Sequence, residues 1–214
     1  MALYITPKDL WDLQQSLAEW RSQRNLTIEG QKVGLLGNLL EELTELARAQ
    51  YPVDQIDALC DMVVFLMNSY GCLDFNPYRI DSKDEILLGG KGLSITELIK
   101  RTAKKYDSKP EDLILDCFNC ILSLGINPIL AMQETIKEIS SRTGVYNKEI
   151  GKFIKHPGFY SKSEAQEVYP YANIEVCDDI IKVWDSGECL VFAKWYKANY
   201  HNARLNKPNS RKQK

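Results

Sequence analysis

The spacing of apolar and polar residues predicts a succession of helices over the first two-thirds of the chain. Residues 9–24 repeat leucines and a tryptophan at helical spacing. A second amphipathic helix is expected over 31–51, and the Tyr51-Pro52 pair ends it. The next helix, over about 53–69, is apolar nearly all round, which is typical of a central, buried helix.

The same pattern continues further along the chain after an interruption. Residues 71–92 are rich in Gly, Asp and Ser and predict a long irregular connection. Amphipathic or strongly apolar helices are then expected over 95–107, 111–125 and 129–144. Gly144 suits the C-cap of the last of these helices.

The remainder of the chain has a different character, because residues 155–200 carry many aromatic side chains. The stretch IIKVWDSGECLVFAKW, at 180–195, favours a β-hairpin that turns at Asp185-Ser-Gly. The overlapping stretch CLVFAKWYKANY, at 189–200, would also serve as a helix, so both interpretations stay open. The last ten residues are polar and are predicted to be disordered.

Length and charge narrow the class of protein only modestly. The 214 residues fit one domain, or one core with a small appendage. A formal net charge of −2 argues against general nucleic-acid binding, which usually needs a basic domain. No apolar run approaches the roughly 20 residues that span a bilayer, and the first residues do not resemble a signal peptide. We therefore expect a cytoplasmic protein that binds neither membrane nor nucleic acid.

The six cysteines predict core packing rather than metal or redox chemistry. Cys117 and Cys120 have CxxC spacing but lie in the middle of a predicted helix without glycine or proline. No second CxxC exists, and the only histidines, His156 and His201, are distant in sequence. This cysteine usage indicates a reducing compartment.

Two aspartates stand out within the most apolar segment of the chain. From Ile56 to Met67, in the stretch DALCDMVVFLM and the residue before it, Asp57 and Asp61 are the only charged residues. Four positions apart, they share one face of the predicted helix. A carboxylate buried alone is very costly, so it shifts its pKa, finds a partner or holds a cation.

The preceding helix contributes a second acidic group. Glu41, Glu42 and Glu45 fall within about one turn, where like charges destabilise a helix, and the first basic residue follows only at Arg48. Alone, such a cluster is more often a solvated surface. However, the short loop before 53–69 makes the two helices antiparallel neighbours, so the two acidic groups face each other. An all-oxygen set of this kind favours Mg²⁺ or Mn²⁺.

The pattern Glu41-Glu42-x-x-Glu45, followed by an acidic pair on the next apolar helix, resembles the MazG-like all-α nucleoside triphosphate pyrophosphohydrolases. This superfamily includes the dimeric dUTPases and phosphoribosyl-ATP pyrophosphohydrolase, and DALCDMVVFLM is similar to the DALxD version of the second motif. The resemblance covers roughly 9–155.

The resemblance implies a mainly α fold, a MazG-like helical bundle that forms a catalytic domain over 1–155. The connection at about 71–110 is longer than in simple members and is expected to be an insertion. A small, aromatic-rich C-terminal extension follows at 156–205. It contains either the β-hairpin or the alternative helix described above. A disordered basic tail is expected at 206–214.

The resemblance also implies a metal site in which Glu42, Glu45 and Asp61 are ligands of Mg²⁺ or Mn²⁺. The family's second motif, ExxD, would place a glutamate where this chain has Ala58. Asp57, one position earlier and one carbon shorter, must substitute for it.

Further roles follow for charged residues around that site. Glu41 is expected to be a further ligand or to orient the attacking water, which makes it the candidate catalytic base. Lys137, Arg142 and Lys152 are nominated for phosphate binding, because Arg suits bidentate contact and Lys supplies a point charge. For each of the three, an ordinary surface role is at least as common.

The implied reaction is hydrolysis of a nucleoside triphosphate to the monophosphate and pyrophosphate by a homo-oligomer, most simply a homodimer with C2 symmetry. Trp20 or Phe65 would stack on the base, although such residues are more often core. Two other classes remain: a non-catalytic nucleotide- and metal-binding module, and a helical interaction protein with structural acids. In a related alternative, Asp112 and Asp116 supply part of the acidic set.

Overall fold

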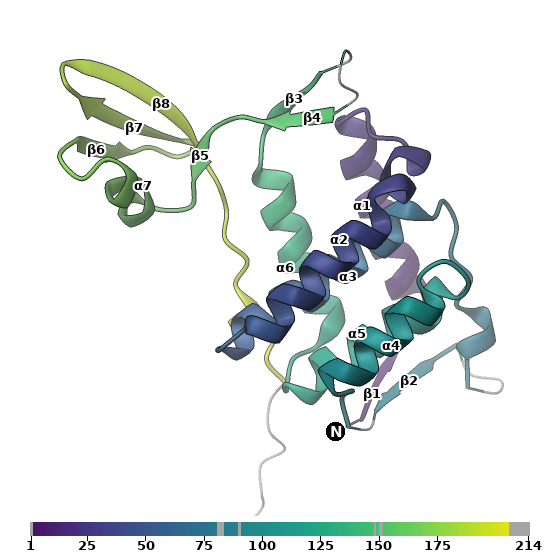
Figure 1. The fold of residues 1–214 in the computed structure, drawn as a ribbon. Helices are drawn as coiled ribbons and strands as arrows, with labels where there is room; N and C mark the ends of the chain where they lie inside the picture. The colour runs from purple at the N-terminus through teal and green to yellow at the C-terminus, as the bar shows by residue number, and fades with distance from the viewer. Residues whose placement is uncertain (1, 81–83, 90, 148, 150–151, 206–214) are drawn as a thin grey trace, which may run out of the picture.

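The structure is a computed structural model that describes residues 2–80, 84–89, 91–147, 149 and 152–205. It is mainly α-helical with a small β region (Figure 1). In chain order the elements are β1 (Ala2–Ile5), α1 (Pro7–Gln23), α2 (Ile28–Arg48), α3 (Pro52–Ser69), η1 (Asn76–Tyr78), β2 (Ile86–Gly89), α4 (Ile95–Lys105), α5 (Pro110–Ser123), α6 (Pro128–Ser141), β3 (Gly144–Asn147), β4 (Lys152–Lys155), β5 (Gly158–Phe159), α7 (Lys162–Val168), β6 (Asn173–Val176), β7 (Ile180–Asp185), β8 (Glu188–Lys194) and η2 (Tyr200–Ala203).

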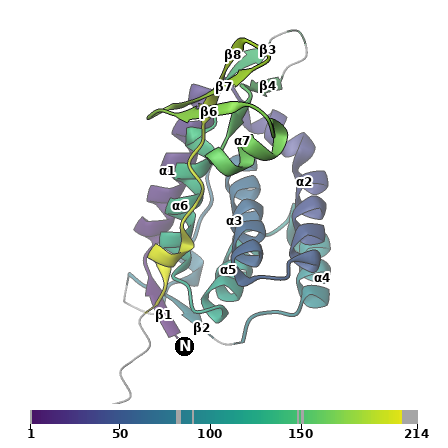
Figure 2. The ribbon, with the colours of Figure 1, turned by 90° about the vertical axis from the view of Figure 1, so that its left-hand side faces the viewer.

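The α3 helix is the centre of the helical body, as its apolar sequence predicted. It packs most extensively on the preceding helix α2 and also contacts α5, α1 and α6. Figure 2 shows α3 between α2 on one side and the α1–α6 pair on the other. From Ile56 to Ser69 the helix is buried except at Asp57, Asp61 and Phe65, which are half-buried, so its two acidic side chains lie at the edge of the core.

The segment predicted as a purely irregular connection contains two regular elements. A 3₁₀ turn, η1, is followed by strand β2, which pairs antiparallel with the N-terminal strand β1. Ile5 and Ile86 face each other in this pair, and both are buried. The pairing was not predicted because its two strands are short and far apart in sequence.

Gly144 is not a helix C-cap, which corrects the prediction. The α6 helix ends at Ser141, and Gly144 begins β3 of a hairpin whose partner strand is β4. A Cβ atom at this position would lie 2.3 Å from the Ile154 carbonyl oxygen and 2.6 Å from the Phe153 ring. The position requires glycine because the two strands approach too closely for any side chain.

The β-hairpin at the end of the chain is confirmed, and the helical alternative for 189–200 is wrong. Strands β7 and β8 pair around Ser186 and Gly187, whose φ angles are +50° and +87°. Two successive positive φ angles are the hallmark of a type I′ turn, which suits a two-residue hairpin. The four-stranded sheet has the order β5-β8-β7-β6 and forms, with α7, a β lobe with its own small core.

After the β lobe the chain returns to the helical body as a strap of residues 195–205, here called the C-terminal strap. It runs beside α6 (Figures 1 and 2), and Ala198, Tyr200 and Ala203 are buried in the main core. The Asn127 N–H donates to the Ala203 carbonyl oxygen, and the Leu205 N–H donates to that of Gly125. The tail predicted to be disordered, 206–214, lies outside the described residues. Among the described helices, none combines the length and the apolar character that a membrane crossing requires.

Candidate functional site

The acidic residues of α2 and α3 converge as the sequence predicted. The two helices run antiparallel (Figure 2). Glu42 of α2 is buried, with 8% of its surface exposed, and is close enough to Asp57 and Asp61 of α3 to feel their charges. Burial raises the pKa of Glu42 to about 8, and the negative charges of Asp61, Glu45, Asp57 and Glu41, in that order, add to the rise. The other four sequence-predicted acids are therefore all close enough to influence Glu42.

Asp61 responds to the same surroundings. Burial raises its pKa to about 7, and the charge of Asp57 raises it further, against the opposing effect of Arg142. The Oε2 atom of Glu42 is buried and accepts no hydrogen bond from any described residue. Carboxylates in this condition either take up protons or attract a cation.

These carboxylates fit a hard divalent cation in donor chemistry. Oxygen donors with an unpartnered buried lone pair are what Mg²⁺ or Mn²⁺ requires. As the side chains of the described residues are placed, however, no three His, Cys, Asp or Glu groups form a ready-made coordination sphere. An ion would have to draw Glu42, Glu45, Asp57 and Asp61 together.

A cavity of about 620 Å³ adjoins the acidic group. Its volume lies within the range of small-molecule sites. Asp61 forms part of its wall, and so do Trp20 and Phe65, the two residues considered for base stacking. Further polar and aromatic walls come from Asn38, Tyr146, Phe153, Arg142 and Lys155.

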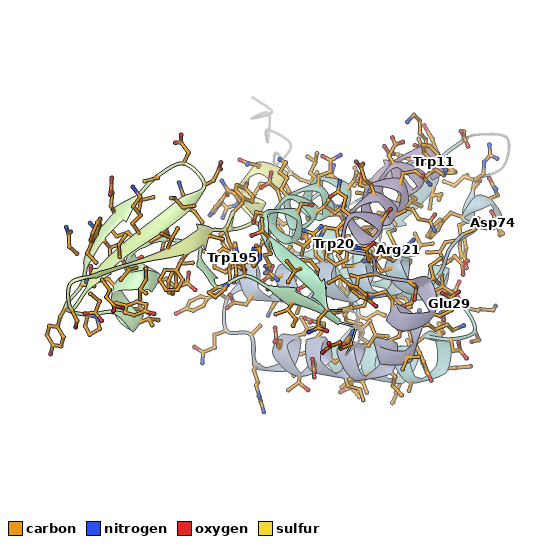
Figure 3. The ribbon with its side chains drawn as sticks, turned by 90° about the horizontal axis from the view of Figure 1, so that it is seen from above. Trp11, Trp20, Arg21, Glu29, Asp74 and Trp195 are labelled. Carbon is orange, nitrogen blue, oxygen red and sulfur yellow. The ribbon has the colours of Figure 1, made fainter. Side chains whose placement is uncertain are left out.

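Arg24 was not singled out from the sequence, yet it organises one end of this cavity. Its guanidinium donates hydrogen bonds of 3.1–3.2 Å to the carbonyl oxygens of Ile139, Ser140 and Arg142, and so caps the end of α6. It also lies 4.7 Å from the ring centroid of Trp20, which Figure 3 places on α1. A single arginine on an amphipathic helix gives no sequence signal of such a role.

The three residues nominated for phosphate binding lie in different places relative to the cavity. Arg142 lines the cavity, and its Nη2 donates to Glu138 over 2.6 Å. Lys137 binds Glu134 at 2.7 Å and borders a separate hollow between α1 and α6, so it is not brought to the cavity. The side chain of Lys152 lies outside the described part of the structure, although its backbone begins β4.

Two glutamates of α6 were missed by the sequence reasoning. Glu134 and Glu138 are both buried; each has a basic partner close in sequence, Lys137 or Arg142, and further partners in the C-terminal strap. The Ala198 backbone N–H donates to Glu138 over 2.7 Å, and the Asn199 N–H donates to Glu134 over 3.1 Å. Their i,i+4 spacing on the apolar face of α6, beside Ile139, was the available sequence signal.

The second aspartate pair, Asp112 and Asp116 on α5, has local counter-charges. Lys105 lies 3.0 Å from Asp112, and Arg101 lies 2.7 Å from Asp116. The Tyr78 hydroxyl also donates to Asp112. The two pairs thus look alike in sequence but differ in structure. The cations that pair with Asp112 and Asp116 come from the neighbouring helix α4, whereas the cation that pairs with Asp57 comes from the C-terminal strap, where Lys197 lies 3.3 Å away.

Three of the six cysteines behave as core residues, whereas Cys72 and Cys189 are exposed and Cys177 is half-buried. All six are free, and Cys60, Cys117 and Cys120 are buried in the main core. Burial raises the pKa of the Cys117 thiol well above its ordinary value, which makes it unreactive.

Comparison of the chain with models of protein families, with curated proteins and with solved structures finds no match. The resemblance to the MazG-like enzymes therefore rests on the residues described above.

Proposed function

We propose that this chain is a metal-dependent nucleoside triphosphate pyrophosphohydrolase of the MazG-like type. The observation that carries the proposal is the meeting of Glu42, Asp57 and Asp61 beside a cavity of nucleotide size. Burial and the neighbouring negative charges raise the pKa of Glu42 and of Asp61, so a cation would stabilise the charged forms of these two carboxylates in particular. A charged polyphosphate beside such a cation is the substrate that the combination suits best.

The residues divide into four roles under this proposal: metal binding, phosphate contact, stacking on the base and acceptance of a proton. Glu42, Glu45, Asp57 and Asp61 would hold Mg²⁺ or Mn²⁺, which supplies positive charge to the phosphate oxygens and makes a bound water more acidic. Arg142 adds positive charge from the cavity wall.

The remaining residues would contact the phosphates, stack on the base or accept the proton that hydrolysis releases. Lys155 lines the cavity and would contact the phosphates in place of Lys137. Trp20 and Phe65 offer aromatic surface for the base. Hydrolysis adds the water oxygen to the α-phosphorus, breaks the α–β anhydride bond and releases a proton. Glu41, which is exposed beside the buried acids, would accept this proton.

A pyrophosphate-release assay tests the proposal directly. Ribo- and deoxynucleoside triphosphates are offered with Mg²⁺ or with EDTA, and monophosphate product is identified. We expect metal-dependent release that Asp61→Asn lowers by at least about 100-fold, because the acidic set loses a charged ligand. Asp116→Asn is the matched control, since Asp116 is paired with Arg101 and should retain activity if it folds. Equal loss in both variants would contradict the assignment of the ligands.

A nucleotide-binding module without catalysis is the second candidate, and one observation favours it. Ala58, which stands where the family pattern has glutamate, is buried and offers no ligand atom. A protein whose melting temperature rises with Mg²⁺ and a nucleotide, but that releases no pyrophosphate from any of them, would have this function.

A further inference from the structure

The C-terminal strap brings a cation to the acidic group. The Nζ atom of Lys197 lies 3.3 Å from Asp57 Oδ2 and 3.4 Å from Glu138 Oε1. It also lies 5.3 Å from the ring centroid of Tyr160. One ammonium group therefore joins a carboxylate of α3 to a buried carboxylate of α6.

The backbone around Lys197 is fixed, which distinguishes it from an ordinary surface lysine. The next residue, Ala198, donates its N–H to Glu138 Oε2, and the Tyr200 hydroxyl donates to Asp57 Oδ1 over 2.6 Å. Both oxygens of Asp57 are thus held by the strap. An exposed salt bridge between two mobile side chains lacks such anchors.

The ammonium group itself retains freedom to move. The Lys197 side chain is 52% exposed, and its four-carbon stem can turn while the strap stays in place. Its positive charge reaches Asp61 in the cavity wall, where it lowers the pKa of that carboxyl against the larger effects of burial and Asp57. Among the described residues, those that line the cavity include Asp61 and Arg142 but not Lys197, so the ammonium group has to turn about its stem to meet a phosphate there.

We propose that Lys197 is a second cation of the site, which pairs with Asp57 when no metal is bound and contacts the triphosphate when metal and nucleotide bind. This inference rests on the proposed function and adds to it a substrate-contacting residue from outside the family-like part of the chain. A metal ion and Lys197 compete for Asp57, whereas phosphate oxygens offer the displaced ammonium a new anionic partner.

This competition predicts opposite effects on two binding constants in the variant Lys197→Met. Affinity for Mn²⁺ alone should rise about two- to five-fold, the range expected from the loss of a half-exposed ion pair. Affinity for a non-hydrolysable nucleoside triphosphate analogue in Mg²⁺ should fall about 10-fold or more, because a charged contact is lost. Lys197→Arg keeps the charge and should bind the analogue within about three-fold of the wild type.

Both constants are measured by titration calorimetry on the full chain, after thermal melting has shown that each variant folds. Lys194→Met is the control, because Lys194 lies on β8 near the strap and its ammonium meets only the Cys177 carbonyl oxygen, at 3.5 Å, among the bonds that the structure shows. It should leave both constants unchanged. Lys197→Gln replaces the methionine variant if the latter does not fold.

The outcomes separate this inference from the proposed function. If the wild type binds Mn²⁺ and the analogue but Lys197→Met changes neither, or weakens both, the role of Lys197 is wrong and the proposed function stands. If the wild type binds neither ligand, both proposals fail. The inference is supported if Lys197→Met binds Mn²⁺ more tightly than the wild type and binds the nucleotide analogue more weakly.

Discussion

Three buried glutamates show how hydrogen bonds decide what a carboxylate can do. Glu42 has an oxygen without a partner, and burial raises its pKa. Burial also acts to raise the pKa of Glu134, but hydrogen bonds from Lys137, Tyr196 and the Asn199 backbone outweigh it and lower the pKa to about 2. Glu138 is satisfied in a similar way by the strap. Only Glu42 is left with lone pairs to offer a cation.

The lowered pKa of Glu134 predicts an acid-sensitive contribution to stability. Its folded pKa of about 2 lies below the ordinary value of 4.5, so the unfolded chain binds the extra proton. The contribution is therefore complete above pH 4.5 and is lost as the pH falls toward 2, up to about 3 kcal/mol. Urea unfolding at a series of pH values should show a smaller acid-side decline in Glu134→Gln than in the wild type.

The exposed Glu167 of α7 supplies the control for this measurement. Glu167→Gln should decline with pH as the wild type does. A Glu134→Gln profile parallel to that of the wild type would mean that Glu134 is not held ionised.

At the residue scale, the sequence predicted those acids whose partners lie nearby in the chain. Glu42 and Asp61 were found because they interrupt apolar helical patterns joined by a short loop. For Glu134 and Glu138 the local partners Lys137 and Arg142 were within reach of the sequence, but the backbone donors of Ala198 and Asn199, some sixty residues later, were not. A pattern of neighbouring residues in the sequence does not indicate a hydrogen-bond partner that lies sixty positions away.

Among the elements, the hairpin of β3 and β4 has the most direct connection to the cavity. It carries Tyr146, Phe153 and Lys155, which line the cavity wall. Its close strand pairing depends on the absence of a side chain at Gly144. The sequence indicated a glycine boundary here but not its purpose, because a helix end and a tight strand crossing favour the same residue.

Substitution at Gly144 should therefore damage both stability and ligand binding. In Gly144→Ala the new Cβ meets backbone at 2.3 Å, so the hairpin must shift and Lys155 must move with it. We expect a loss on the order of 5 °C in melting temperature and weaker binding of the nucleotide analogue. Thermal melting and calorimetry on the same samples give both values.

Gly37 in α2 provides a matched glycine control. A Cβ there has nothing within 4 Å, and Ala is the better helix former by about 1 kcal/mol. Gly37→Ala should melt higher than the wild type and bind the analogue normally. If Gly144→Ala binds the analogue as the wild type does, the β3–β4 hairpin is not part of the binding site.

On the scale of the whole molecule, the outer face of α2 stays apolar. Val33, Leu36 and Leu40 follow one another at helical spacing and are exposed, Val33 by 89%. This stripe lies on the helix that carries Glu42 on its inner face. It is the surface on which we place the homodimer that the sequence led us to expect.

Charged residues on this stripe should separate the subunits. We expect the wild type to have the mass of a dimer by light scattering and Val33→Lys/Leu40→Lys to have that of a monomer, because the like charges would face each other across a C2 axis. Val168→Lys, which changes an exposed valine on α7 of the β lobe, should leave the mass unchanged. A wild-type monomer would contradict the dimer.

The order of the helices along the chain was predictable from the sequence. The contacts between segments that are distant in the sequence were not. Repeating leucines and proline boundaries located α1, α2 and α3 to within a few residues. The pairing of β1 with β2 and the return of the strap depend on contacts between distant segments. Trp195, where the β lobe meets the helical body (Figure 3), illustrates this, because its ring packs against Gly158 and Tyr160 of another segment.

The distance along the chain between Asp57 and its partners affects how the protein is made. Lys197 and Tyr200 lie 140 and 143 positions after Asp57. A ribosome therefore releases the acidic helices, and then the β lobe, before it delivers the residues that neutralise Asp57 and Glu138. Until then Asp57 lacks both partners, so this part of the packing of the helical body is completed only after the C-terminal strap has been synthesised.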